Sequence, residues 1–244
     1  MGSKIIGLVV PEAVDSIPAE SVLMYPGITF IARGIALRSL SAAGYDEAIE
    51  RVIPAAENLA ARGAQAIMLI GTSLTFYRGA AFNDELIDRV SSAARVPAGT
   101  MSGAIIDGLH AVGARQLAIT TAYACEVNEL LAIFLRQKGF ELRSLQSLGA
   151  ANLVGDAARV TPQDICDLSL ESIAGALRAD GVLIVCGGLR TLDIIVHIEN
   201  ACGVPVVSSM PAALWAAARL VGESGYVGPG YGRLLSGMDG QIVS

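Results

Sequence analysis

Short apolar segments that end in glycine, serine or proline alternate along this chain with longer, alanine-rich segments of helical periodicity. We predict strands at residues 4–10, 66–70, 97–100, 116–120, 141–146, 181–185 and 205–208. Helices are predicted at residues 45–62, 79–94, 102–112, 126–138, 162–178, 192–202 and 211–221. This alternation is typical of repeated βαβ units, and a content of 53% hydrophobic but only 5% aromatic residues suits the same α/β class.

The two halves of the chain resemble each other at an offset of about 110 residues. GAQAIMLIGT precedes RVPAGTMS in the first half, and ADGVLIVCGG precedes GVPVVSSM in the second. We therefore predict two pseudo-symmetric Rossmann-like lobes, each a parallel four-stranded sheet flanked by helices. The first lobe is expected at 1–114 plus 214–244 and the second at 115–213. Pseudo-symmetry would place the turns at Gly71 and Cys186 on opposite sides of one cleft, at the strand ends where ligands bind.

The composition restricts the classes of partner and the cellular location that we expect for this protein. The longest apolar runs, at 66–70 and 130–135, are far shorter than the roughly 20 residues of a membrane span. The N-terminal residues have neither a long apolar region nor a plausible cleavage site, so we expect a cytoplasmic protein. A formal net charge of −6 without a Lys/Arg run argues against a nucleic-acid partner. The sequence leaves the oligomeric state open.

The four cysteines and two histidines offer few metal ligands. The cysteines lack both the spacing of a disulfide scaffold and a CxxC pair, so we expect reduced thiols. His110 and His197 do not form an HxxxH arrangement, and we expect neither a zinc site nor a histidine-based triad.

Two polar turns are candidates for the site. Residues 71–79 carry several hydroxyls directly after a buried strand, including those of Thr72 and Ser73, which could bind a carboxylate or a developing oxyanion. Helix capping by these two side chains is the commoner role for such residues. Thr120 and Tyr123 follow the central strand of the second half in the same way. Helices that begin at such turns would direct their amides toward an anionic, dicarboxylate-like ligand.

Cys186 stands apart from the other cysteines because it follows a strand, in a glycine-rich turn. We expect it at a helix N-terminus, which lowers the pKa of a thiol and makes thiol and thiolate both accessible for proton transfer. A strand-end cysteine taken alone is more often a small hydrophobic residue than a catalyst. Its glycine neighbours and the pseudo-symmetric position of Gly71 favour the catalytic interpretation.

Five segments, at 71–83, 121–123, 186–193, 203–209 and 228–234, resemble the aspartate/glutamate racemase superfamily. The first and third are specific to its arylmalonate decarboxylases. Racemases and maleate isomerases of the superfamily use two cysteines, one from each lobe. Here the first-lobe position is Gly71, so a proton donor stands on one face only, which suits stereospecific protonation and disfavours racemisation.

The resemblance implies cofactor-free decarboxylation of a disubstituted arylmalonate, through an enediolate, to a chiral 2-arylpropionate. Cys186 would donate the proton, while Thr72, Ser73, Tyr123 and backbone amides near Gly71 and Gly187 would bind the remaining carboxylate. The apolar pocket for the departing carboxylate would be lined by residues that match the family's small-pocket positions, namely Pro11, Leu37, Leu40 and Leu153. The next position of that pocket falls on Asp156, where the family has an apolar side chain. Either the register slips there or the substrate differs.

Two alternatives remain at this point. The first is an isomerase or racemase of the same superfamily that pairs Cys186 with a second base. The second is a catalytically silent protein that binds a small dicarboxylate at the same helix ends.

Overall fold

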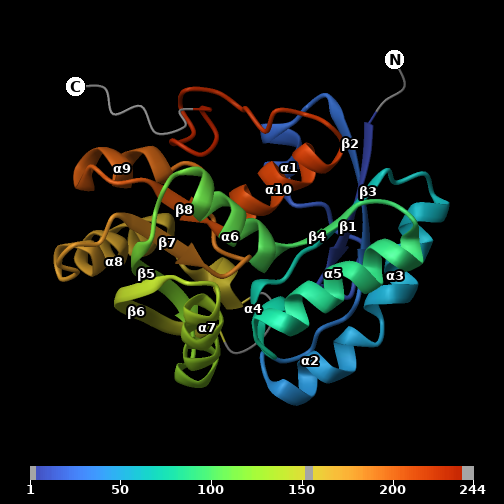
Figure 1. The fold of residues 1–244 in the computed structure, drawn as a ribbon, viewed down its shortest axis with the longest axis horizontal. Helices are drawn as coiled ribbons and strands as arrows, with labels where there is room; N and C mark the ends of the chain where they lie inside the picture. The colour runs from blue at the N-terminus through green and yellow to red at the C-terminus, as the bar shows by residue number, and fades with distance from the viewer. Residues whose placement is uncertain (1–3, 152–155, 238–244) are drawn as a thin grey trace.

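The computed structural model describes residues 4–151 and 156–237 and has two parallel sheets (Figure 1). The first sheet has the order β2-β1-β3-β4, and the second has the order β6-β5-β7-β8. Since β5 to β8 repeat the order of β1 to β4, the two halves of the chain share one topology, as the internal similarity predicts. The strands are β1 (Lys4–Val10), β2 (Ile28–Gly34), β3 (Ala66–Leu69), β4 (Ala98–Thr100), β5 (Gln116–Tyr123), β6 (Glu141–Ala151), β7 (Gly181–Val185) and β8 (Val206–Ser208).

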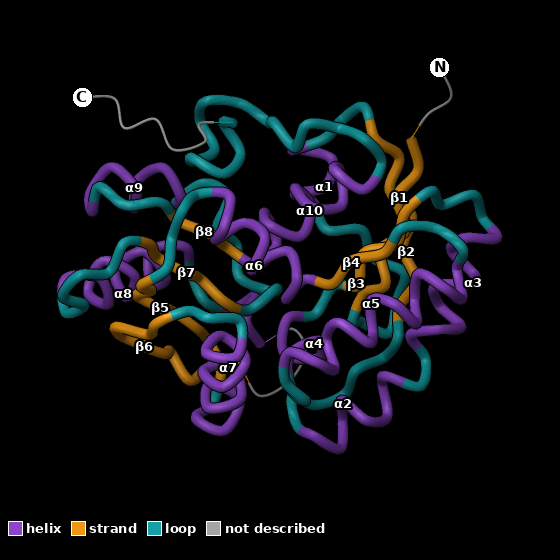
Figure 2. The backbone as a smooth tube through the Cα atoms, in the orientation of Figure 1, coloured by secondary structure: helices purple, strands orange, loops and turns teal. Residues whose placement is uncertain are grey.

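Helices flank both sheets, and α4, α6 and α10 lie between them (Figure 2). None of the described helices is long and apolar enough to cross a membrane. The helices are α1 (Ala19–Met24), α2 (Ala42–Ile49), α3 (Val52–Ala61), α4 (Thr72–Phe76), α5 (Ala80–Ala94), α6 (Met101–Ala111), α7 (Cys125–Gln137), α8 (Pro162–Ala174), α9 (Ile195–Cys202) and α10 (Ser209–Leu220).

Several elements differ from the sequence prediction. The strand β2 and the short helix α1 were not predicted, because β2 lies at a sheet edge and buries only alternate residues such as Ile28 and Phe30. The helix predicted at 45–62 is two helices, α2 and α3, with a break before Pro54. A proline at this position cannot donate to the Glu50 carbonyl, and its ring crowds that group, so a continuous helix is excluded. The helix α8 ends at Ala174, with Gly175 as its C-cap, short of the predicted residue 178.

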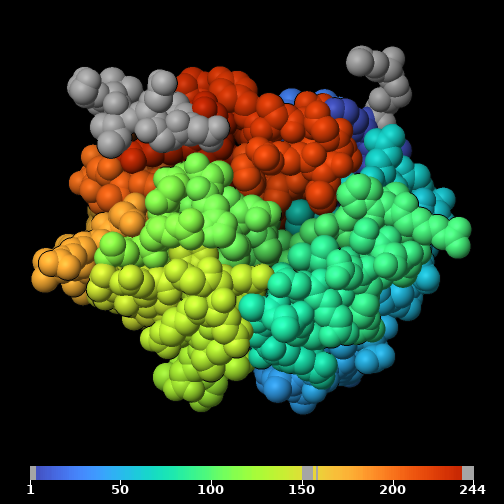
Figure 3. Space-filling model, in the orientation of Figure 1, coloured from blue at the N-terminus to red at the C-terminus, as the bar shows by residue number. Residues whose placement is uncertain are grey.

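The central strands β1, β3, β5 and β7 are buried on both faces, as expected for parallel sheets covered by helices. The helices α6 and α10 pack on each other, and each contacts both β4 and β8. The chain that follows α10 lies beside the N-terminal part of the molecule (Figure 3). The Tyr25 hydroxyl, directly after α1, donates to the Gly225 carbonyl at 2.8 Å. The lobe boundaries at 114, 115, 213 and 214 remain a prediction, since α6 and α10 join the two halves.

Candidate active site

The turns after β3 and β7 have the same unusual backbone conformation. Gly71 has a φ of 121° and Cys186 a φ of 137°, at positions that the internal similarity makes equivalent. Glycine adopts such a conformation freely, whereas a side chain there costs about 1–3 kcal/mol and is found mainly at functional sites. The chain therefore holds the Cys186 thiol at a strained position.

The Cys186 thiol is buried, and 8% of the residue is exposed. Burial raises the pKa of Cys186 to about 11, although the Gly188 backbone amide and the Tyr123 hydroxyl act in the opposite direction. The expected helix N-terminus is wrong, because Cys186 instead opens a turn closed by the Leu189 amide, and α9 begins only at Ile195. Because burial outweighs the opposing influences of Gly188 and Tyr123, the group remains a protonated thiol at neutral pH, which is the form that a proton donor needs.

The hydroxyls of the first-lobe turn belong to the first residues of α4, whose N-cap is Gly71. Thr72 and Ser73 are both buried, and the Thr72 hydroxyl contacts Met101 Sδ at 2.9 Å and Ser209 Oγ at 3.3 Å. Ser209 Oγ also accepts from the Cys186 backbone amide at 3.3 Å. Ser209, the first residue of α10, thus links the two turns.

Two tyrosines lie close to the thiol. Burial raises the pKa of Tyr123 well above its usual range, and a charge on Cys186 would raise it further, while the hydroxyls of Thr72 and Ser73 lower it. Burial also raises the pKa of Tyr45 to about 12, against the influence of Ser73. The sequence analysis missed Tyr45 because α2 carries no motif that distinguishes it from a core residue. Both phenols remain protonated and can donate hydrogen bonds.

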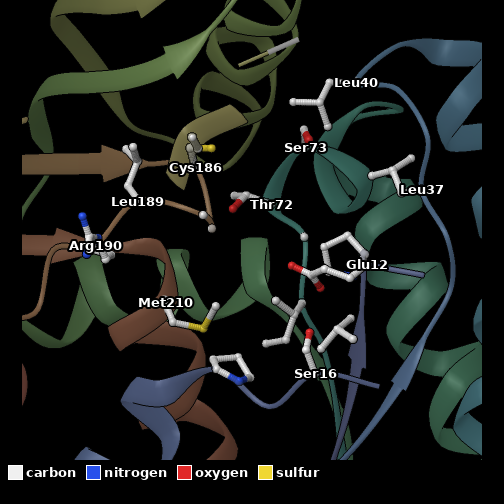
Figure 4. A pocket seen from close by; sticks show the side chains of 18 of the residues that line it. Glu12, Ser16, Leu37, Leu40, Thr72, Ser73, Cys186, Leu189, Arg190 and Met210 are labelled. Carbon is white, nitrogen blue, oxygen red and sulfur yellow. The ribbon is translucent and has the colours of Figure 1, made fainter. Parts of the chain in front are cut away.

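Cys186, Thr72, Ser73 and Tyr123 line one cavity of about 270 Å³ between the two halves (Figure 4). It brings together nine of the residues singled out from the sequence, which are Pro11, Leu37, Leu40, Gly71, Thr72, Ser73, Tyr123, Cys186 and Gly187. The remaining lining residues are Val10, Glu12, Ser16, Ile17, Pro18, Glu20, Ile70, Ala157, Gly188, Leu189, Arg190 and Met210. The sequence gives little signal for this second group, and four of its members, Glu12, Ser16, Ile17 and Pro18, come from the irregular segment between β1 and α1.

Asp156 is not among the described residues that line the cavity, so its assignment to the pocket is wrong. It opens a short 3-10 turn and pairs with Arg159 at 3.8 Å, while its neighbour Ala157 lines the cavity instead. A Cβ on Gly188 would lie 3.1 Å from the Ala157 Cβ, so the two chain segments pack directly together. Ala157, the residue after Asp156, thus supplies an apolar part of the cavity wall. Leu153 lies outside the described residues.

Gly187 lies close to the first half of the chain. A Cβ added to Gly187 would be 3.0 Å from Met101 Sδ, so a larger residue would push the Cys186 turn away from the hydroxyls. In the part of the chain that the structure describes, no three His, Cys, Asp or Glu side chains are grouped to hold a metal ion.

The two lobes share one topology, and both contribute residues to the cavity between them. This arrangement defines a class of pseudo-symmetric α/β enzymes. The maleate isomerase Iso from Pseudomonas putida S16 has the same fold, with a TM-score of 0.86 at 21% identity over 96% of this chain and 98% of that one. A double-substituted arylmalonate decarboxylase in its liganded form, with one glycine changed to cysteine and one cysteine to serine, has a TM-score of 0.93 at 43% identity, covering 96% and 99%.

The sequence matches are more specific than the shared fold. The arylmalonate decarboxylase family matches residues 6–235. The arylmalonate decarboxylase of Bordetella bronchiseptica is 45% identical over 229 residues, which is 94% of this chain and 95% of that protein. The chain belongs to the arylmalonate decarboxylase family, and with it to the carboxy-lyases.

Proposed function

We propose that this enzyme decarboxylates disubstituted arylmalonates to chiral 2-arylpropionates without a cofactor, through an enediolate that Cys186 protonates. The observation that carries the proposal is the pairing of a buried, protonated thiol on one side of the cavity with Gly71 at the equivalent position. Cys125, Cys166 and Cys202 are not among the described residues that line the cavity. A single donor therefore supplies the proton from a single face.

One substrate carboxylate binds at the hydroxyls of Thr72, Ser73 and Tyr123, together with the backbone amides at the start of α4 and at Gly187. When the bond between the α-carbon and the other carboxylate breaks, its electron pair moves to the α-carbon and spreads over the bound carboxylate. Negative charge then builds up on the oxygens that face these donors. Loss of one such donor typically costs about 3 kcal/mol of transition-state stabilisation.

The departing carboxylate faces the apolar wall of Leu37, Leu40 and Ala157. An apolar wall solvates a carboxylate anion poorly, whereas it accommodates neutral CO2 well. The wall therefore favours loss of the carboxylate as CO2. The Cys186 thiol then transfers its proton to the α-carbon, and the resulting thiolate regains a proton from solvent. Protons and electrons balance without a metal or an organic cofactor.

The test is a panel of α-aryl-α-methylmalonates, with CO2 release and the chirality of the product as readouts. Cys186→Ala is expected to lose activity, and Cys166→Ala, a change of the same type at a buried thiol in α8, is expected to keep it. Turnover by Cys186→Ala at the wild-type rate would contradict the proposal. Binding without turnover by the wild type would instead indicate a silent dicarboxylate-binding protein.

A racemase or isomerase has less support, because the cavity holds no second thiol opposite Cys186 among the described residues. Deuterium incorporation into unreacted substrate in D2O would favour it. We also propose a cytoplasmic location and no nucleic-acid partner. The four free thiols support a reducing compartment, and the net charge of −6 disfavours nucleic acid.

A further inference from the structure

The outer part of the cavity differs in character from its inner end. The inner end combines the donors and the thiol with the apolar wall of Leu37 and Leu40, while charged side chains line the outer part. Glu12 and Glu20 belong to the first half of the chain and Arg190 to the second, and Figure 4 shows the Glu12 carboxylate pointing into the cavity.

The charged groups of Glu12 and Arg190 have no partner within the described part of the protein. In residues 4–151 and 156–237, the Glu12 carboxylate and the Arg190 guanidinium make no hydrogen bond or ion pair. Both residues are exposed, so water forms hydrogen bonds with their charged groups when the cavity is empty. A ligand in the outer part displaces that solvent, and it must replace the lost hydrogen bonds or bind more weakly.

The tetrahedral α-carbon of the substrate decides which group enters this outer part. On the proposed function, one carboxylate faces the hydroxyls, the other faces the apolar wall, and Cys186 approaches the α-carbon. The larger substituent, the aryl ring, is left to extend toward the Glu12 carboxylate. A plain phenyl ring brings no hydrogen-bond donor to this side chain.

We infer that the preferred substrates carry a hydroxyl group on the aryl ring, which donates to the Glu12 carboxylate. A carboxylate accepts hydrogen bonds and donates none, so a ring hydroxyl supplies the donor that it needs. An anionic ring substituent is repelled by Glu12. The inference rests on the proposed function and adds the substrate class.

The experiment compares hydroxyphenyl, methoxyphenyl and phenyl methylmalonates, with the ring substituent in the meta and the para position. A methoxy group can accept but not donate, so the hydroxyl-to-methoxy ratio of kcat/KM isolates the donor to Glu12. For at least one ring position we expect a ratio of about 5, the upper range for an exposed interaction with a charged group.

Glu12→Leu is expected to bring that ratio to about 1, because the acceptor is gone, and Glu12→Gln to leave it in between, because an amide oxygen still accepts. Glu57→Leu, at an exposed glutamate on α3, is the matched control and should keep the wild-type ratio. Equal kcat/KM for the hydroxyl and methoxy compounds in the wild type, or a ratio unchanged in both Glu12 variants, would overturn the inference.

A binding measurement separates this inference from the proposed function. Calorimetric titration of Cys186→Ala with the same compounds reports ring recognition without turnover. Tighter binding of the hydroxyl compound that depends on Glu12 supports the inference even if the wild type releases no CO2, in which case only the proposed function fails. Turnover of every compound without ring discrimination overturns the inference alone.

Discussion

The strained backbone at Cys186 predicts an unusual order of stabilities. Replacement of Cys186 by alanine or by glycine removes the same sulfur, so the two variants differ only by a Cβ at a φ of 137°. Glycine relieves the strain, which is about 1–3 kcal/mol for a side chain in such a region. Against this, glycine loses a buried carbon worth about 0.8 kcal/mol and has a more flexible unfolded state, worth about 0.4–1 kcal/mol.

The net expectation is that Cys186→Gly is at least as stable as Cys186→Ala. Cys166 provides the control, since it is buried to a similar degree but lies within the helix α8. There, glycine should be less stable than alanine by about 2 kcal/mol, the sum of helix propensity and lost burial. The difference between the two sites therefore measures the strain at Cys186 and cancels the terms that they share.

The assay is equilibrium unfolding of all four variants in urea. The free energies of unfolding are compared where the variants show the same dependence of this free energy on urea concentration. Both Cys186 variants are also expected to be inactive, which would show that the wild type keeps a strained thiol at the expense of stability. The reasoning would be refuted if the alanine variant were more stable than the glycine variant by the same margin at both sites.

Further outcomes are expected at four residues, Gly71, Cys186, Ser73 and Ser209. Gly71→Cys should lower the optical purity of the product, measured by chiral chromatography, because a Cβ there meets nothing closer than the Leu74 Cβ at 3.6 Å and a second thiol would face the other side. The kcat–pH profile should fall near pH 11, since burial raises the pKa of Cys186 to about 11, and a fall centred below pH 9 would contradict the buried donor. The folding free energy should carry the same signature, because a raised pKa in the folded state gives stability that is complete below the unfolded pKa of about 8.5 and is lost as the pH rises through the folded value. Ser73→Ala should lower kcat by about 100-fold in steady-state assays, the typical cost of one lost oxyanion donor. Ser209→Ala should lower stability to urea by about 1–3 kcal/mol, because the Cys186 amide loses its acceptor, and unchanged stability would rule out that link.

Much of the architecture could be predicted from local patterns. Buried parallel strands are continuous apolar runs, so β1, β3, β5 and β7 stand out, and the repeated segments around Gly71 and Cys186 predict two halves of one topology. The edge strand β2 was missed because only its alternate residues are buried, and the break before Pro54 was missed because both helices share one apolar periodicity.

The sequence by itself determined the chemistry available to this protein: a thiol after one strand, a glycine at the equivalent place after another, and hydroxyls beside that glycine. Only the tertiary structure decided the state of the thiol, because burial, which depends on residues distant in the chain, raises the pKa of Cys186, and the helix expected directly after it begins only at Ile195. Packing also placed Ala157 in the wall instead of Asp156 and turned Glu12 toward the cavity. These outcomes depend on which segments meet across the two halves, and a local pattern does not encode that.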